Sequence, residues 1–190
     1  MDVDRPTRVS TLVVAAASRH GSTAEIADRL ADELTRCLSA RWVVRRVSLS
    51  DVRALDGADA VILGSAIYYG RWMRSAATIL EHLRAAPPRH LWLFSTGPVD
   101  EDELENEHVI SADTAAELGR ADGHRVFGGR LEHAGLTFTE RLVVRAVRAR
   151  SGDHRNWADV NEWAHAVAAE LDADREVDIA SEPVPRRPGA

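Results

Sequence analysis

Apolar segments of strand length alternate with amphipathic segments of helix length along this chain. Residues 9–17, with the sequence VSTLVVAAA, form a continuous apolar run, which is typical of a strand buried on both faces of a parallel sheet. Residues 23–39 then carry leucine or isoleucine at every fourth position from Ile26 to Leu38, among charged residues. This spacing predicts an amphipathic helix. The chain therefore opens with a strand followed by a helix.

The same alternation continues as far as residue 171. A proline pair, Pro87 and Pro88, ends one predicted helix, and the glycine pair Gly128 and Gly129 interrupts the weakest strand pattern. The remaining predicted strands are 42–49, 60–65, 90–95 and 125–131, and the remaining predicted helices are 74–86, 111–123, 140–150 and 156–171.

Strands that alternate with helices imply a parallel sheet covered on both faces and joined by right-handed crossovers. The 190 residues suit one domain, which we place at residues 9–172, after a flexible N-terminal segment of residues 1–8. Beyond residue 172 the apolar pattern stops and three prolines follow, so we expect residues 173–190 to be a disordered tail. Sheets of this kind bind ligands at the carboxyl ends of their strands. The residues after each strand are therefore the candidate site.

The composition excludes several classes of chemistry. All 24 basic side chains are arginine, and without lysine there is neither a Walker-type phosphate lysine nor a Schiff base. The single cysteine, Cys37, excludes an intrachain disulfide and a cysteine-ligated iron–sulfur cluster, so redox chemistry requires a bound organic cofactor. A net charge of −6 argues against a nucleic-acid partner. The histidine pattern suits no metal site, and we assign none.

The hydropathy pattern also bears on location. No apolar run reaches the ~18 residues of a membrane span, and residues 1–8 are charged rather than apolar. We therefore expect neither a membrane span nor a signal peptide, and a cytoplasmic protein.

The segment after the first predicted strand has the composition of an anion site. Residues 18–23, with the sequence SRHGST, run directly into the predicted helix. Free N–H groups, the positive end of the helix dipole and hydroxyl donors meet at such a helix start. Because the G-x-G-x-x-G and G-x-x-x-x-G-K-[ST] motifs are both absent, a single phosphomonoester fits best. The alternative is that Ser22 and Glu25 only form a capping box.

Aromatic and small polar residues follow two later strands. Residues 65–72, with the sequence SAIYYGRW, hold three aromatic side chains in a chain that is 5% aromatic, and such a loop suits a flat ring stacked beside the phosphate. Residues 95–99, STGPV, offer backbone groups to the polar edge of that ring. The alternative is that Tyr68 or Trp72 packs under the next helix. The pattern predicts three loops around one ligand.

These segments together resemble the flavodoxin family, in which a first loop of the form T/S-x-T-G-x-T holds the ribityl phosphate of FMN and two later loops hold the isoalloxazine. Ser18, Gly21, Ser22 and Thr23 match the first motif, whereas His20 departs from it by replacing a hydroxyl. The segments AASRHGSTAEIADRLADEL, LGSAIYYGRWMRSA and LWLFSTGPV, with VFGG and DHRNWADVNEWA, are similar to the flavodoxin-domain branch of menaquinone-dependent protoporphyrinogen oxidase.

The resemblance covers residues 9–171 and implies an α/β fold, a flavodoxin-like three-layer sandwich with a five-stranded parallel sheet in the order 2-1-3-4-5 and helices on both faces. It implies FMN as the cofactor, with Tyr69 and Trp72 against the ring and residues 95–97 as donors along its pyrimidine edge. No catalytic residue is assigned. The cofactor-binding residues that it implies are Ser18, Arg19, His20, Gly21, Ser22, Thr23, Ser65, Ala66, Ile67, Tyr68, Tyr69, Gly70, Trp72, Ser95, Thr96, Gly97 and Pro98.

We therefore expect an FMN-binding oxidoreductase or electron-transfer protein, of the protoporphyrinogen oxidase type, that acts on a redox partner, a quinone or another small molecule. Two alternatives stay open: a cofactor-free flavodoxin fold that serves as an interaction module, and an NAD(P)H-dependent quinone reductase. A phosphorelay receiver is disfavoured, because Gly64 and Ser65 stand where its phosphoacceptor aspartate would lie.

Two charged segments have more than one interpretation. The acidic residues within 100–107 would lower the hydroquinone potential of a nearby flavin, or they form a solvated loop. Residues 140–150 form a basic amphipathic pattern that suits peripheral membrane contact or an acidic partner. The same pattern also suits an ordinary helix that faces the core.

Overall fold

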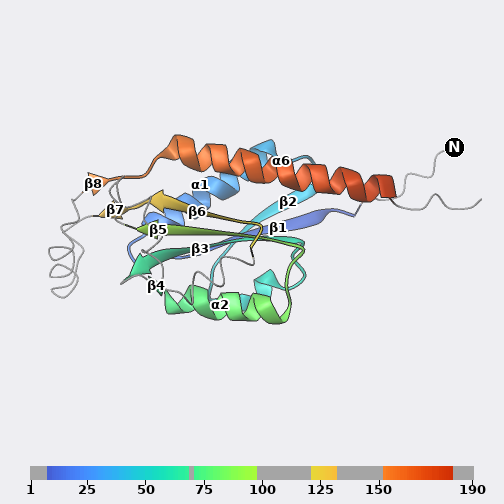
Figure 1. The fold of residues 1–190 in the computed structure, drawn as a ribbon. Coiled ribbons are helices and arrows are strands. Elements are labelled where there is room, and N and C mark those ends of the chain that lie inside the picture. Colours follow the sequence, from blue (N-terminus) through green and yellow to red (C-terminus); the bar gives the residue numbers. More distant parts are fainter. Residues whose placement is uncertain (1–7, 69–70, 98–120, 132–151, 182–190) are drawn as a thin grey trace, which may run out of the picture.

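The computed structural model of the protein describes residues 8–68, 71–97, 121–131 and 152–181. Within these residues, five parallel strands form the central sheet in the spatial order β2-β1-β3-β5-β6 (Figure 1). Counted along the chain as parallel strands alone, this is the expected order 2-1-3-4-5. The five strands are β1 (Ser10–Ala17), β2 (Trp42–Val47), β3 (Ala60–Tyr68), β5 (His90–Gly97) and β6 (Gly123–Gly128).

Helices cover both faces of the sheet. In Figure 1, α1 (Ser22–Cys37) and α6 (Trp157–Ser181) lie on one face, and α2 (Arg74–Ala85) lies on the other. A short 3-10 helix, η1 (Val52–Leu55), precedes β3. The expected three-layer α/β sandwich is therefore the observed fold.

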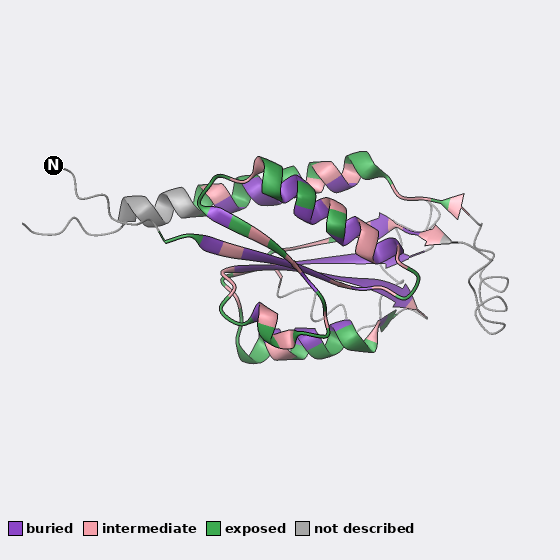
Figure 2. Ribbon diagram, turned by 180° about the vertical axis from the view of Figure 1, so that it is seen from behind, coloured by how far each residue is buried: buried purple, intermediate pink, exposed green. Residues whose placement is uncertain are grey.

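Strand β1 shows why the sheet needs two helical layers. Leu12 and Val14 belong to the buried cluster formed with α1 and α6, whereas Val13 and Ala15 belong to the cluster formed with α2. All four side chains are fully buried, so the continuous apolar run reflects burial on both faces. Figure 2 shows the same pattern, with buried strands between helices that expose their outer faces.

Helix α1 confirms the four-residue spacing found in the sequence. Ile26, Leu30 and Leu34 are fully buried against the sheet and α6, while Asp28 and Asp32 are exposed. The apolar stripe therefore drives the packing of the helix, and the two aspartates face water.

The strand predicted at 125–131 is two separate strands. β6 ends at Gly128, and β7 (Arg130–Leu131) pairs antiparallel with β8 (Gly152–Asp153) in a second, two-stranded sheet. A Cβ on Gly128 would lie 2.1 Å from the backbone oxygen of His154. The glycine therefore lets two backbone segments cross in contact, and the strand breaks there.

Two further boundaries differ from the prediction. Strand β3 extends to Tyr68, where β4 (Arg71–Trp72) turns back and pairs antiparallel with its end. Helix α6 continues ten residues beyond the predicted end at residue 171, so residues 173–181 are helical rather than a disordered tail. They contain no glycine or proline, the residues that stop helices.

Several predictions fall on residues that the structure does not describe. The helix predicted at 140–150 lies outside the described residues, as do residues 111–120 of the helix predicted at 111–123. Residues 121–122 form a bend before β6. Residues 1–7 of the segment predicted at 1–8 and residues 182–190 of the segment predicted at 173–190 are also outside the described residues.

Candidate functional site

The first loop, residues 18–21, joins the carboxyl end of β1 to the start of α1. Gly21 has a φ of 88°, a left-handed conformation that residues with a side chain rarely adopt. It is the N-cap of α1, and no side chain caps the helix. The amide N–H groups of Ser22, Thr23 and Ala24 find no acceptor among the described residues. The loop therefore presents three free donors at the positive end of the helix.

The two hydroxyls that open α1 make contacts with distant segments. Ser22 Oγ accepts a hydrogen bond from the Arg130 amide at 2.9 Å, and Thr23 Oγ1 lies 2.7 Å from Thr96 Oγ1. Because Ser22 Oγ acts as an acceptor, its own O–H hydrogen is left for another partner. Glu25 contacts arginines rather than the start of its own helix. The alternative of a simple capping box is therefore not what the structure shows.

Three predicted loop segments meet at one edge of the sheet. Ala17, Ser65 and Ser95 lie level with one another in the register of β1, β3 and β5. The Arg19 guanidinium lies 5.9 Å from the centre of the Tyr68 ring, which joins the first loop to the end of β3. The Thr23–Thr96 contact joins α1 to the end of β5 in the same way.

The Trp72 side chain has the second of the two positions that the sequence left open. Its indole is 8% exposed and belongs to the buried cluster that includes Ala76 and Ile79 of α2. Its Nε1 donates a hydrogen bond to Ser95 Oγ at 2.9 Å. The alternative of packing under the next helix is therefore confirmed, and contact of Trp72 with a flavin ring stays a prediction. The cause of this packing is the reversal at β4, which returns Trp72 to the end of β3.

The hydroxyls of Ser65 and Ser95 are also committed to the interior, since both residues are fully buried. Ser65 Oγ accepts from the Met73 amide and donates to the Ala66 carbonyl, both at 2.9 Å. Ser95 Oγ accepts from Trp72 and lies 2.9 Å from Nε2 of His124. Any contact of these two serines with a ligand would have to use backbone atoms.

His124, which the sequence did not single out, joins Trp72 and Ser95 in a neutral hydrogen-bonded cluster. Burial lowers its pKa from 6.5 to about 4, so the imidazole is neutral near pH 7. Its Nε2 forms a hydrogen bond with the Ser95 hydroxyl, in which either atom can be the donor, because that hydroxyl can accept a second bond besides the one from Trp72. The pairing of β6 with β5 brings His124 to this place. No local sequence pattern marks it.

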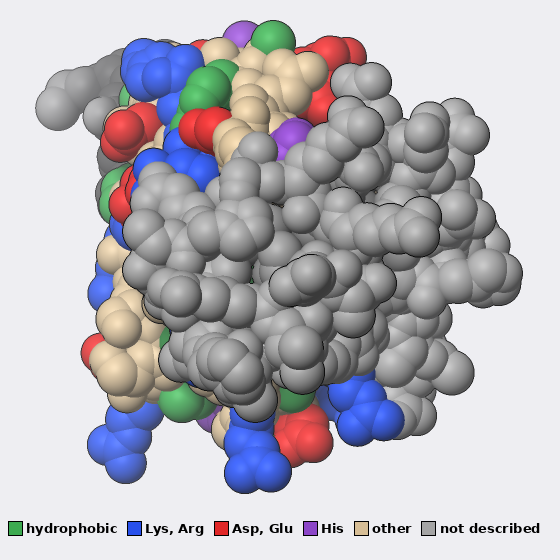
Figure 3. Space-filling model, turned by 90° about the vertical axis from the view of Figure 1, so that its left-hand side faces the viewer, with side chains coloured by type: hydrophobic (Ala, Val, Ile, Leu, Met, Phe, Trp, Pro, Cys, Tyr) green, Lys and Arg blue, Asp and Glu red, His purple; other side chains and the backbone are tan. Residues whose placement is uncertain are grey.

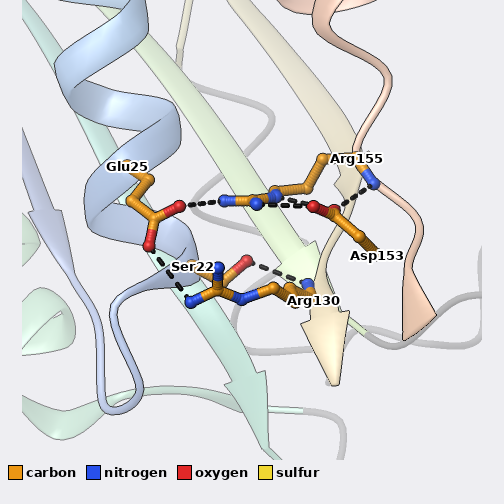
Figure 4. A network of polar contacts seen from close by, with 5 residues as sticks. All are labelled: Ser22, Glu25, Arg130, Asp153 and Arg155. Carbon is orange, nitrogen blue, oxygen red and sulfur yellow. Dashed lines mark hydrogen bonds and ion pairs between the residues drawn. The ribbon is translucent and has the colours of Figure 1, made fainter. Parts of the chain in front are cut away.

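A second, charged cluster lies beside the start of α1 (Figure 4). Arg130 Nη2 lies 3.2 Å from Glu25 Oε1, and Arg155 Nη1 contacts the other carboxylate oxygen of Glu25. Arg155 also binds Asp153 through two nitrogens, at 2.7 and 2.6 Å. We call Ser22, Glu25, Arg130, Asp153 and Arg155 the arginine cluster.

The arginine cluster has no net formal charge, because two guanidinium groups balance two carboxylates. Hydrogen bonds from Arg155 lower the pKa of Asp153 to about 2, and Asp153 raises the pKa of Arg155 in turn. The Arg155 side chain is 5% exposed and its guanidinium lies 4.7 Å from the centre of the Trp157 ring. In the view onto this end of the molecule, charged side chains of both signs are intermixed over the layer of α1 and α6 (Figure 3).

The arginine cluster could not be found from sequence spacing. Arg130 and Arg155 are 105 and 130 residues from Glu25 along the chain. Its one local signal is the S-x-x-E spacing of Ser22 and Glu25, which places both on the same side of α1.

The other predicted cofactor residues divide into three groups. Ser18, Arg19 and His20 are partly or fully exposed in the first loop. Ala66, Ile67 and Gly97 are buried at the ends of β3 and β5. Tyr69, Gly70 and Pro98, with the acidic residues at 100–107, lie outside the described residues.

Two absences hold only for the part of the chain that the structure describes. No group of three histidine, cysteine or acidic side chains there is arranged to hold a metal ion. None of the described helices is long and apolar enough to cross a membrane.

The fold and this edge of the sheet define a class of α/β proteins whose ligands bind at the carboxyl ends of parallel strands. A family model described as "Flavodoxin domain" matches residues 13–157. The chain therefore belongs to the flavodoxin domain family, and its fold is flavodoxin-like. A comparison with curated proteins finds no match.

Solved structures similar to this chain include two that it spans almost completely. One is a flavodoxin from the domain Archaea, with a TM-score of 0.54 and 13% identity over 85% of this chain and 99% of the other. The second is an oxidoreductase from Corynebacterium diphtheriae, with a TM-score of 0.55 and 17% identity over 87% and 96%.

A third similar structure belongs to a larger protein. It is the rubredoxin oxygen:oxidoreductase of Desulfovibrio gigas, with a TM-score of 0.55 and 15% identity over 86% of this chain. This chain spans only 36% of that protein's length. At such identities these likenesses establish the fold.

Proposed function

We propose that this chain binds FMN at the carboxyl edge of its sheet and acts as a flavin-dependent electron-transfer protein or oxidoreductase. Membership of the flavodoxin domain family supports this function. The observation that carries it is the meeting of three segments, the free N–H donors that open α1 and the ends of β3 and β5. A bound FMN would supply the redox chemistry.

The first loop fits the phosphate of FMN. Three amides that have no acceptor among the described residues, the positive helix end and the O–H hydrogen of Ser22 all offer donors to one anion. The left-handed backbone at Gly21 turns the chain into the helix, and a Cβ there would lie 3.7 Å from Glu25. The donors are therefore in place before any ligand arrives, so little reorganisation is needed for binding.

The ends of β3 and β5 are proposed to hold the ring. Tyr68 is partly exposed at the end of β3, with Arg19 above its ring. Backbone groups at Thr96 and Gly97, together with Tyr69, Gly70 and Pro98, are the proposed remaining contacts. Ser65 and Ser95 hold the loop backbones through their hydrogen bonds to Met73 and Trp72. These residues bind and orient the cofactor and keep water from one face of it.

Flavin titration tests the proposal directly. We expect the purified protein to quench FMN fluorescence on binding and to retain yellow flavin through gel filtration. Colourless protein that neither binds nor quenches added FMN would contradict the proposal. It would favour the alternative of a cofactor-free fold that serves as an interaction module.

The finer proposal is an enzyme of the protoporphyrinogen oxidase type that passes electrons to a quinone. The similarity of the first, third and fourth loop segments to that branch supports it. Protoporphyrinogen and a menaquinone analogue added to the FMN-loaded protein should yield porphyrin fluorescence. Without porphyrin formation this specificity fails, while rapid bleaching of bound FMN by NADH or NADPH would instead indicate a quinone reductase.

A further inference from the structure

Arg130 is held next to the start of α1 by its backbone. Its amide donates to Ser22 Oγ at 2.9 Å. Just before it, the Gly129 amide donates to the Gly97 carbonyl at 2.8 Å, and the Gly129 carbonyl accepts from His154 at 3.0 Å. The backbone of Arg130 is therefore tied to α1, and the segment before it is tied to β5 and to the residue after β8.

The Arg130 side chain is placed to meet an anion at this helix start. Its side chain is 32% exposed, and its guanidinium reaches Glu25, one turn into α1, at 3.2 Å. Ser22 and Glu25 lie three residues apart, on the same side of the helix. The guanidinium thus lies beside the first turn, whose free N–H groups are proposed to receive the FMN phosphate (Figure 4).

Glu25 does not depend on Arg130 for its charge balance. The nearly buried Arg155 also binds the Glu25 carboxylate. Arg155 is itself fixed by Asp153 and stacked on Trp157. If the Arg130 guanidinium turned from Glu25 to a phosphate, Glu25 would therefore keep Arg155 as an arginine partner.

We propose that Arg130 binds the phosphate of FMN and makes the site select the phosphorylated flavin over riboflavin. This inference rests on the proposed function, because it assumes that FMN occupies this edge. A planar guanidinium makes paired hydrogen bonds with phosphate oxygens. Its charge also offsets Glu25, which lies within one helical turn of the dianion. Riboflavin lacks the phosphate and gains nothing from Arg130.

The test compares FMN and riboflavin affinities, measured by fluorescence quenching, in wild type, R130Q, R130K and a matched control. R125Q is the control, because Arg125 lies on β6 and forms a partly exposed ion pair with Asp159 at 3.0 Å. We expect R130Q to weaken FMN binding about tenfold, R130K to weaken it less, and R125Q to leave it unchanged. Riboflavin affinity should be the same in all four proteins.

Salt provides a second readout. Raising the ionic strength should weaken FMN binding more in wild type than in R130Q, because the guanidinium–phosphate attraction is partly exposed and screened. Circular dichroism confirms that each variant is folded.

The outcomes separate the two proposals. Wild type that binds FMN with an affinity unchanged in R130Q and R130K, or variants that lose riboflavin as strongly as FMN, would overturn the role of Arg130 alone. Wild type that binds neither flavin would overturn the proposed function and, with it, this inference.

Discussion

Two polar clusters lie at the same edge of the sheet and are built in opposite ways. The cluster of Trp72, Ser95 and His124 is neutral and largely buried, and hydrogen bonds join its three side chains to one another. The arginine cluster consists of paired charged side chains without net charge, is partly exposed, and lies beside N–H groups that have no acceptor among the described residues. We propose that the first cluster supports the loops and that the second contacts the ligand.

The largest expected effect on stability comes from removing one of the hydrogen-bonded side chains Trp72, Ser95 and His124. Trp72→Ala removes a buried indole and leaves Ser95 without its donor, so the free energy of unfolding should fall by about 3–5 kcal/mol. Trp157→Ala is the control, because Trp157 is 36% exposed and its ring stacks on Arg155. This substitution should lower the free energy of unfolding by at most about 1 kcal/mol. Urea denaturation measures the free energy of unfolding of each variant. Similar losses for the two variants would contradict the supporting role of the Trp72 cluster.

Protonation of His124 gives the next effect. The folded pKa of about 4 lies below the ordinary value of 6.5, so between these pH values the unfolded chain binds the proton and the folded chain does not. The contribution of neutral His124 to the free energy of unfolding should therefore be fully present above pH 6.5. It should fall by about 2 kcal/mol towards pH 4, less than the pKa difference alone would give, because the side chain is partly exposed.

The variant H124Q isolates this contribution. It removes the titrating group, so the free energy of unfolding should depend less on pH between 6.5 and 4 than in wild type. Equal pH profiles for the two proteins would show that His124 titrates normally in the fold.

A smaller effect, on FMN affinity, tests the start of α1 beside the arginine cluster. Ser22→Asp places a carboxylate at the start of α1, where it should weaken FMN binding about tenfold by repelling the phosphate. The helix itself tolerates an acid in its first turn, so stability should hold. Ala40→Asp adds the same charge beyond the far end of α1 and should leave FMN affinity unchanged. Equal FMN affinities in wild type and S22D would argue against this loop.

The fold was largely predictable because its signals are local. The apolar run of β1 and the four-residue spacing of α1 report burial directly, and the alternation of strands and helices implies parallel pairing. Boundaries were less accurate. α6 extends past its apolar pattern because helix-compatible residues continue to Ser181.

The site was only partly predictable, because much of it depends on contacts between distant residues. The helix start and the meeting of three loops follow from strand ends, which the sequence locates. The burial of Trp72 depends on a reversal at β4, and the arginine cluster depends on strands β7 and β8 reaching α1. Neither the reversal at β4 nor the approach of β7 and β8 to α1 produces a periodic pattern in the sequence around these residues.

The central claim, that the start of α1 holds the FMN phosphate, is most directly tested by phosphorus NMR of the FMN-loaded protein across pH 5 to 8. Free FMN changes its phosphate protonation with a pKa of about 6, whereas N–H donors and arginine should hold the bound phosphate as a dianion. We predict a bound resonance whose position does not change over this range. A resonance that titrates as it does in free FMN would contradict the claim.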